Sequence, residues 1–276
     1  MTAQDLYLDL LANVLTRATF EDNDEILGLR NYWTPPSWKR RAGAVTAKVV
    51  NRFGIELVLK RPYDAEARES GRDWPARAET MVGLRRLHNA RECIESVLAD
   101  GVPGDLIETG VWRGGMAIYM RGVLAAHAVA DRTVWCADSF QGLPAPSPTE
   151  YPADKELHLE QFEYLSVGVE IVRRNFARYG LLDNQVQFLV GWFKDTLPTA
   201  PIKQLSILRL DGDLYESTSH ALQNLYPKLT PGGYCIIDDY GNIDACKKAV
   251  EDYRRANGIA DEICDVDGYC VYWRRT

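Results

Sequence analysis

The sequence predicts an α/β fold of the Rossmann-like, doubly wound kind: a mostly parallel sheet with helices on both faces, a C-terminal antiparallel hairpin and an N-terminal helical extension. Three observations predict it. After residue 78, short runs of branched apolar residues alternate with longer segments of helical periodicity. A glycine-rich turn at 110–115 joins the first such run to a helix. Near the C-terminus, runs at 262–264 and 269–273 flank a tight turn, which is typical of a hairpin.

The N-terminal part has a different pattern, so we expect a helical extension over 1–72 and a main domain over 73–276. Residues 5–18 have the apolar spacing of an amphipathic helix, which would bury its apolar face on the core or on a second subunit; we favour a homodimer. Residues 38–61 are rich in Lys and Arg, with apolar residues at helical spacing. Residues 64–77 are charged and poor in apolar residues, which predicts a loop.

In the main domain the expected elements alternate along the chain. Helices are expected at 79–99, 114–128, 167–178, 217–229 and 243–257. Strands are expected from 106 onward and at 133–137, 186–190, 205–210 and 234–237. The proline-rich stretch 141–154 predicts a long loop that covers the site as a lid.

Composition narrows the functional class. The chain of 276 residues is 46% hydrophobic and 26% charged, as is ordinary for a globular protein. A net charge of −7 argues against general nucleic-acid binding. The six cysteines form no C-x-x-C pair, the N-terminus does not resemble a signal peptide, and no apolar run approaches the ~20 residues of a membrane span. We therefore expect a cytoplasmic protein without a membrane span.

Three aspartates, Asp211, Asp238 and Asp239, each follow a predicted buried strand. The helix expected between these strands makes them parallel neighbours, so the carboxylates emerge at the sheet edge where ligands bind in open α/β folds. Such carboxylates cannot stay ionised together without a cation, and all-oxygen ligation favours a hard ion such as Mg²⁺. The alternative is that Asp238 and Asp239 cap the following helix while Asp211 faces water.

The turn at 110–115 occupies the position of a nucleotide-binding loop. A dinucleotide fingerprint starting at Gly110 requires glycine at 112, where the backbone approaches a pyrophosphate, but the residue is Trp112. The indole argues against NAD and FAD. S-adenosylmethionine has no pyrophosphate and needs only the tight turn and polar groups. Asp138 ends the second strand, where an acidic residue receives ribose hydroxyls.

Several strings resemble those of the macrocin (TylF/MycF-type) sugar O-methyltransferases, and the resemblance spans about residues 73 to 276. The strings are Asp73-Trp-Pro, Glu79-Thr-Met-Val-Gly, Gly104-Asp-Leu-Ile-Glu-Thr-Gly-Val-Trp-Arg-Gly-Gly115, Asp138-Ser-Phe-Gln-Gly-Leu-Pro144, Gly191-Trp-Phe-Lys-Asp-Thr-Leu-Pro198, Asp211-Gly-Asp-Leu-Tyr-Glu-Ser-Thr218 and Asp238-Asp-Tyr240. The resemblance implies methyl transfer from S-adenosylmethionine to a sugar hydroxyl, with Mg²⁺, on a macrolide deoxysugar, a rhamnoside or a mannoside precursor of a methylated polysaccharide. The basic stretch at 30–62 is longer than expected for the macrolide enzymes, which leaves the acceptor open.

Residue roles follow from these positions and the resemblance. Asp211 is expected to bind the metal with Asp238 and Asp239 and to accept the proton. His158 is a second candidate general base, or a solvent-facing residue of the lid. Trp192 stacks on the adenine or belongs to the core. The expected cofactor-binding residues are Glu108, Thr109, Gly110, Gly114, Gly115, Asp138, Ser139 and Trp192.

Two functions of other classes stay open. A metal-dependent methyltransferase for catechol-type phenols uses a similar carboxylate site. A non-catalytic binding protein of the same fold would dock residues 38–61 on an anionic surface.

Overall fold

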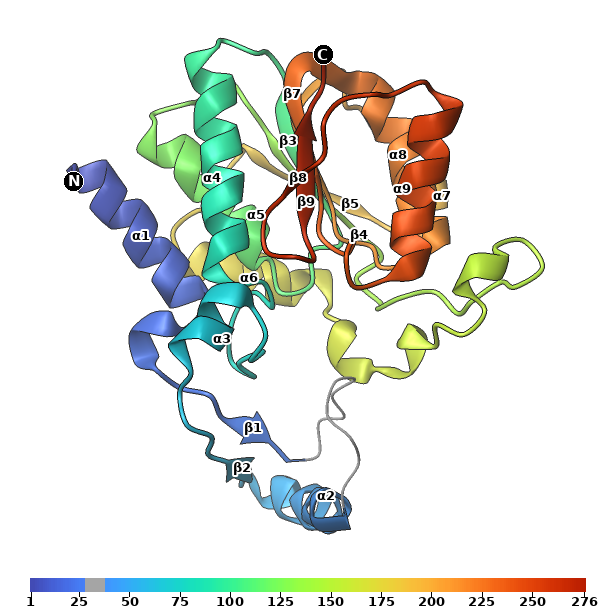
Figure 1. The fold of residues 1–276 in the computed structure, drawn as a ribbon. Coiled ribbons are helices and arrows are strands. Elements are labelled where there is room, and N and C mark those ends of the chain that lie inside the picture. Colours follow the sequence, from blue (N-terminus) through green and yellow to red (C-terminus); the bar gives the residue numbers. More distant parts are fainter. Residues whose placement is uncertain (28–37) are drawn as a thin grey trace.

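The computed structural model describes residues 1–27 and 38–276, without the side chains of 38–42. A seven-stranded sheet of order β5-β4-β3-β6-β7-β9-β8 forms its centre, with helices on both faces (Figure 1). Strands β5, β4, β3, β6 and β7 are parallel neighbours in this order, and β9 pairs antiparallel with both β7 and β8. The predicted fold class and the C-terminal hairpin are therefore confirmed. No helix in the described ranges is long and apolar enough to cross a membrane.

Strands β3, β4, β5 and β6 match the predicted runs closely, because buried branched residues with flanking turns specify them, whereas β7 is longer than predicted and β8 and β9 lie slightly later in the chain. Their bounds are β3 Asp105–Thr109, β4 Val134–Asp138, β5 Val186–Val190, β6 Leu205–Leu210, β7 Leu229–Ile237, β8 Cys264–Asp265 and β9 Val271–Arg274.

Helices cover the sheet as two layers with separate apolar cores. One layer packs a core that includes Leu8, Ile94 and Met120, and the other a core that includes Leu222 and Val250. The first layer contains α1 (Ala3–Leu15), α4 (Leu84–Ala99), α5 (Gly115–Ala126) and α6 (Val169–Arg178). The second contains α7 (Phe193–Thr196), α8 (Tyr215–Leu225) and α9 (Asp244–Ala256).

The N-terminal helix joins the main core. Thr2 and Asp5 form a reciprocal capping box at its start. Leu8 is fully buried against the first layer, whereas Leu6 and Leu10 are each 57% exposed. The predicted amphipathic helix is thus confirmed, with its apolar face on the core; the homodimer and the boundary at 72/73 stay predictions.

Beyond α1 the chain leaves the core. Strands β1 (Glu25–Ile26) and β2 (Val58–Leu59) pair antiparallel, and α2 (Trp38–Val50) lies beside them, below the main sheet in Figure 1. The helical periodicity predicted within 38–61 is confirmed over α2. The part of the basic stretch at 30–37 lies outside the described residues, as do the side chains at 38–42.

The loop predicted at 64–77 is wrong in part, because it contains the helix α3 (Ala65–Ser70). Helix α3 has too few apolar residues to show a periodic pattern in the sequence, and its ends are set by capping residues instead. Asp64 accepts a hydrogen bond from the backbone N–H of Ala67 at 3.0 Å, and Gly71 ends the helix in the left-handed conformation.

Other boundaries also differ from the prediction. The helix predicted at 79–99 begins only at Leu84, because Gly83 packs against the backbone of Gly71 too closely for any side chain. The helix predicted at 217–229 ends at Leu225, and β7 already begins at Leu229. Residues 231–233 lie inside β7, where the pairing with β6 shifts register.

The strand order places the site. Strands β3 and β6 are neighbours although the chain builds β4 and β5 between them, so their carboxyl ends form the switch point of the sheet. In the register, Thr109 lies beside Leu210, and Leu210 beside Ile237. The residues that follow these three positions therefore meet at one edge.

Candidate functional site

The three aspartates predicted to bind a metal lie together. Asp211, Asp238 and Asp239 each offer an oxygen within 4.8 Å of the other two. Backbone hydrogen bonds of the parallel pairing continue past the strand ends and fix the positions of two of the aspartates. The Asp211 N–H donates to the Thr109 carbonyl at 2.8 Å, and the Asp238 N–H donates to the Leu210 carbonyl at 2.9 Å. Asp238 and Asp239 are buried.

Two buried arginines, which sequence reasoning missed, reach into this cluster. Arg209 on β6 donates to Glu108, Asp211 and Asp238. Arg86 on α4 pairs with the other oxygen of Asp238 at 2.5 Å. Both oxygens of Asp238 therefore face a guanidinium group, so its charge is better compensated than those of its neighbours. Arg209 had a detectable signal, namely a charge at a position between buried leucines of a strand.

The other carboxylates of the cluster have too few positive groups nearby to balance their negative charge. Burial, aided by repulsion from Asp238, raises the pKa of Asp211 to about 6. Burial and the charge of Asp211 raise the pKa of Asp213 to about 8. Burial, with repulsion from Asp213, also raises the pKa of Asp239. Such an acidic cluster would be stabilised by a divalent cation, and its donors are the oxygens that Mg²⁺ prefers.

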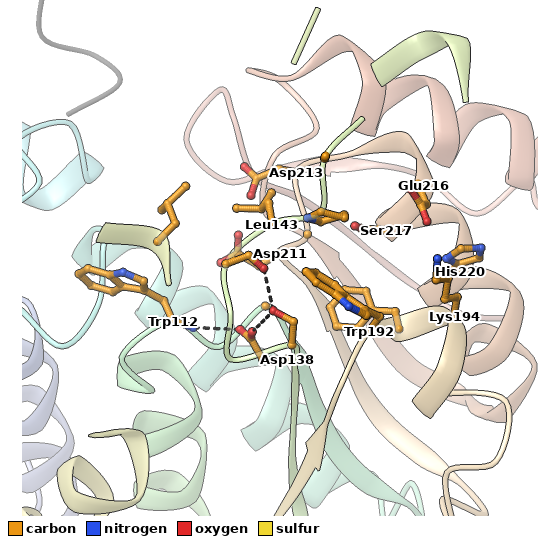
Figure 2. Close-up of a pocket in the computed structure, with 18 of the residues that line it drawn as sticks. Trp112, Asp138, Leu143, Trp192, Lys194, Asp211, Asp213, Glu216, Ser217 and His220 are labelled. Carbon is orange, nitrogen blue, oxygen red and sulfur yellow. Dashed lines mark hydrogen bonds between the residues drawn. The ribbon is translucent and has the colours of Figure 1, made fainter. Parts of the chain in front are cut away.

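A cavity of about 320 Å³ adjoins the cluster and is lined by four of the eight residues predicted to bind the cofactor. Asp138 lies below Asp211 and is flanked by Trp112 and Trp192 (Figure 2). Lys194 lies beyond Trp192 as seen from Asp138. Gly110 and Ser139 line the same cavity. The structure thus brings Gly110, Asp138, Ser139 and Trp192 together.

Asp138 also holds its surrounding loops. Its carboxylate accepts hydrogen bonds from the backbone N–H groups of Val111 at 2.7 Å, Trp112 at 3.3 Å and Phe140 at 2.7 Å. Burial raises its pKa, and these backbone donors oppose the rise. The residue therefore ties the turn after β3 to the turn after β4, a role that sequence reasoning did not foresee.

The glycine-rich turn is required by close backbone packing. A Cβ atom at Gly110, whose φ is 87°, would lie 1.6 Å from the carbonyl oxygen of Asp211. Thr109 is fully buried, and Gly114 and Gly115 pack against α6 and the 79–80 backbone. The structure has a second, larger cavity beside the one of about 320 Å³. Thr109, Gly114 and Gly115 line neither of the two, so their contact with a cofactor stays a prediction.

Glu108 lies on β3, two residues before Gly110, and contacts Arg209, which also contacts Asp211 and Asp238. It is 2% exposed, and burial raises its pKa to about 8 although Arg209 opposes the rise. One oxygen accepts from Arg209 at 2.7 Å, and the other, Oε2, is buried without a hydrogen-bond partner. An unpaired buried carboxylate oxygen is costly, and a cationic group of a ligand beside it would lower that cost.

A second, larger cavity of about 550 Å³ opens on the other side of the aspartates. Aromatic and aliphatic side chains make up much of its lining, among them Trp74, Tyr164, Tyr269, Leu157 and Leu159. Glu108, Asp211, Asp213, Asp238 and Asp239 also line it. Because Gly110, Trp112, Asp211 and Asp213 line both cavities, the two meet at the carboxylate cluster.

Residues of the 139–168 segment, between β4 and α6, line both cavities, and the loop predicted at 141–154 lies within this segment; its role as a lid stays a prediction. Asp154 is 1% exposed and accepts hydrogen bonds from the backbone N–H groups of Tyr215 at 2.7 Å and Glu216 at 3.0 Å, at the start of α8. His158 lies in this segment but its side chain is 58% exposed and lies 3.5 Å from Glu160. It lines neither cavity, and its role as general base stays a prediction.

Comparison with known proteins relates this geometry to a family. The family model described as macrocin O-methyltransferase (TylF) matches residues 4–275. The chain is 51% identical over 275 residues, 99% of its own length and 94% of the relative's, to 8-demethyl-8-(2,3-dimethoxy-alpha-L-rhamnosyl)-tetracenomycin-C 4'-O-methyltransferase of Streptomyces olivaceus. It is 46% identical to mycinamicin III 3''-O-methyltransferase of Micromonospora griseorubida, covering 100% of this chain and 98% of that protein.

A solved structure agrees. The O-methyltransferase NovP superposes with a TM-score of 0.83 at 49% identity, over 99% of both chains. The family match covers nearly the whole sequence, including the aspartates and both cavities. The chain therefore belongs to the macrocin O-methyltransferase family.

Proposed function

We propose that this protein transfers a methyl group from S-adenosylmethionine to a sugar hydroxyl of a glycoside, with Mg²⁺ at the aspartate cluster. The observation that carries the proposal is the meeting of two cavities at Asp211, whose carboxylate forms a cluster with Asp238 and Asp239. One cavity suits the cofactor and the other suits the acceptor, so the cluster lies where their reacting atoms would meet.

The smaller cavity fits the cofactor. Asp138 would bind the ribose hydroxyls, Trp192 would pack on the adenine, and Ser139 would line the same part of the cavity. Glu108 lines the larger cavity, where Gly110 links the two cavities, and its unpartnered Oε2 would receive the ammonium group of the methionine portion there. When bound, the cofactor supplies an activated methyl group on a sulfonium centre. The chain's part is to hold it in line with the acceptor.

The aspartate cluster fits a divalent cation. Its oxygens are close enough to share one ion, and the raised pKa values of Asp211 and Asp239 indicate missing positive charge. A Mg²⁺ ion there would supply the charge that makes a hydroxyl group easier to ionise. Asp211 has the most exposed carboxylate of the three, with 27% exposure, and is our candidate to accept the proton.

The larger cavity supports a glycoside rather than a free monosaccharide. Its volume is in the range that holds a drug-sized ligand, and its aromatic lining suits an apolar aglycone. The relatives are named for methylation of a rhamnosyl tetracenomycin and of mycinamicin III, both large acceptors. We therefore propose a deoxysugar attached to an apolar aglycone as the acceptor.

Location and assembly are part of the same proposal. All six cysteines are free, which supports the reducing cytoplasm as the site of action. The exposed Leu6 and Leu10 on α1 support a homodimer.

An acceptor panel tests the activity. The protein is incubated with S-adenosylmethionine, Mg²⁺ and one of three acceptors: a rhamnoside with an aryl or macrolide aglycone, free rhamnose, or a catechol. Mass spectrometry should detect one added methyl group on the glycoside, and fragmentation should locate it on the sugar. Faster methylation of the catechol would favour a phenol methyltransferase, and no methylation of any acceptor would favour a binding protein.

A further inference from the structure

Arg209 is a charged residue at the centre of the sheet. It lies in β6, between β3 and β7, and is 1% exposed. Its neighbours in the strand, Leu208 and Leu210, belong to the apolar core. Removing a guanidinium group from water is costly, and replacement by an apolar residue is often neutral or stabilising for the fold. Its place in this strand therefore calls for an explanation beyond packing.

Its contacts join three parallel strands. Nη1 donates to Glu108 Oε1 on β3 at 2.7 Å and to Asp211 Oδ2 after β6 at 2.9 Å. Nη2 pairs with Asp238 Oδ1, which follows β7. Glu108 and Arg209 are also register partners on neighbouring strands, and Arg209 contacts Glu108 and both aspartates. A planar fork can hold several carboxylates in fixed directions, which the point charge of a lysine cannot do.

The partners of Arg209 belong to different parts of the site. Glu108 keeps its second oxygen without a partner and is our candidate for the cofactor's ammonium group. Asp211 and Asp238 belong to the cation cluster. No hydrogen bond between Glu108 and these aspartates is recorded among the described side chains, whereas Arg209 contacts all three.

We propose that Arg209 is a positioning residue that sets the cofactor half and the cation half of the site at the same time. It holds Glu108 by one oxygen so that the other stays free, and it fixes Asp211 and Asp238 at the spacing that a single cation requires. This inference rests on the proposed function, because it assumes that both ligands bind here.

Calorimetry of the Arg209→Lys variant with Mg²⁺ and, separately, with S-adenosylhomocysteine tests the proposal without turnover. Lysine keeps the charge but loses the fork, so both affinities should fall by about tenfold or more. Glu108→Gln should weaken S-adenosylhomocysteine alone, and Asp239→Asn should weaken Mg²⁺ alone. Arg121→Lys is the matched control, since Arg121 is 7% exposed and pairs with Asp183 away from the site; both affinities should stay within threefold.

An Arg209→Lys variant that binds both ligands like the wild type, or that loses only one of them, would overturn the proposal. Should that variant fail to fold, a crystal structure of the wild type with Mg²⁺ and S-adenosylhomocysteine decides. Arg209 should then contact Glu108, Asp211 and Asp238 together, and a guanidinium that has left either side contradicts the proposal. A wild type that binds neither ligand refutes the proposed function instead.

Discussion

The indole N–H of Trp112 donates a hydrogen bond to the backbone carbonyl of Tyr164 at 2.8 Å. Trp112 lies in the turn after β3 and lines both cavities, and Tyr164 lies in the 139–168 segment and lines the larger one. The bond therefore fastens the segment that closes the site to the turn that carries the proposed cofactor. Trp112, which stands where a dinucleotide fingerprint requires glycine, thus has a structural function of its own.

Trp112→Phe removes this bond and keeps an aromatic ring. A neutral hydrogen bond contributes about 1 kcal/mol, so we expect the KM for the acceptor to rise about fivefold and the 139–168 segment to be cleaved faster in limited proteolysis. Trp135→Phe is the control, because its indole donates to Asp105 at 2.9 Å outside the cavities. Equal kinetic effects of the two substitutions would show that the closing bond has no specific role.

Asp138→Ala should weaken S-adenosylhomocysteine binding. A hydrogen bond to a charged group contributes roughly 1.5–3 kcal/mol, which is about ten- to 150-fold in the dissociation constant. The variant also releases the amides of Val111 and Phe140, so the effect should lie toward the upper end. Calorimetry measures it. Asp105→Ala, at the opposite end of β3, removes comparable contacts to Thr133 and Trp135 and should leave binding unchanged. An unchanged constant for Asp138→Ala would reject the ribose contact.

Leu8→Ala should destabilise the fold, because Leu8 is fully buried in the core that α1 shares with α5. A large-to-small change at such a site costs about 2–5 kcal/mol. Leu10→Ala on the exposed face should cost less than about 0.5 kcal/mol in the monomer. Denaturant unfolding at low protein concentration compares the two. A loss at Leu10 as large as that at Leu8 would contradict the orientation of α1.

Removal of divalent cations should stop methyl transfer. The reason is the excess of acidic groups at the cluster, where Asp211 and Asp239 have raised pKa values. Activity on a glycoside acceptor is measured after exhaustive chelation and again after addition of Mg²⁺, with Na⁺ at equal ionic strength as the control. Full activity in the chelated protein would exclude a role for the cation in turnover.

Much of the sheet could be predicted from the sequence because its central strands β3, β4 and β6 are largely buried. Their apolar runs end at turn residues, and the parallel order alone brings Asp211 beside Asp238. The part of the site that lies at the carboxyl ends of the parallel strands was therefore predictable. By contrast, α3 is set by caps at Asp64 and Gly71 and has too few apolar residues for a periodic pattern.

The rest of the site depends on contacts between distant segments. Tyr164 and Trp74 reach the larger cavity from loops, whose course no periodicity specifies. Arg86 reaches Asp238 across 152 residues of sequence. The side chain of His158 is 58% exposed, which agrees with the solvent-facing alternative that the sequence left open.

We propose that Asp211 serves the chemical step and not cofactor binding. Single-turnover methyl transfer by Asp211→Asn, with S-adenosylmethionine and a glycoside acceptor both saturating, tests it most directly. Asparagine keeps the shape but removes the charge that would hold the cation and the capacity to accept a proton. We predict a rate below a tenth of wild type, a barrier increase above ~1.4 kcal/mol, with S-adenosylhomocysteine affinity within about threefold. A variant that keeps more than a tenth of the rate would contradict the claim.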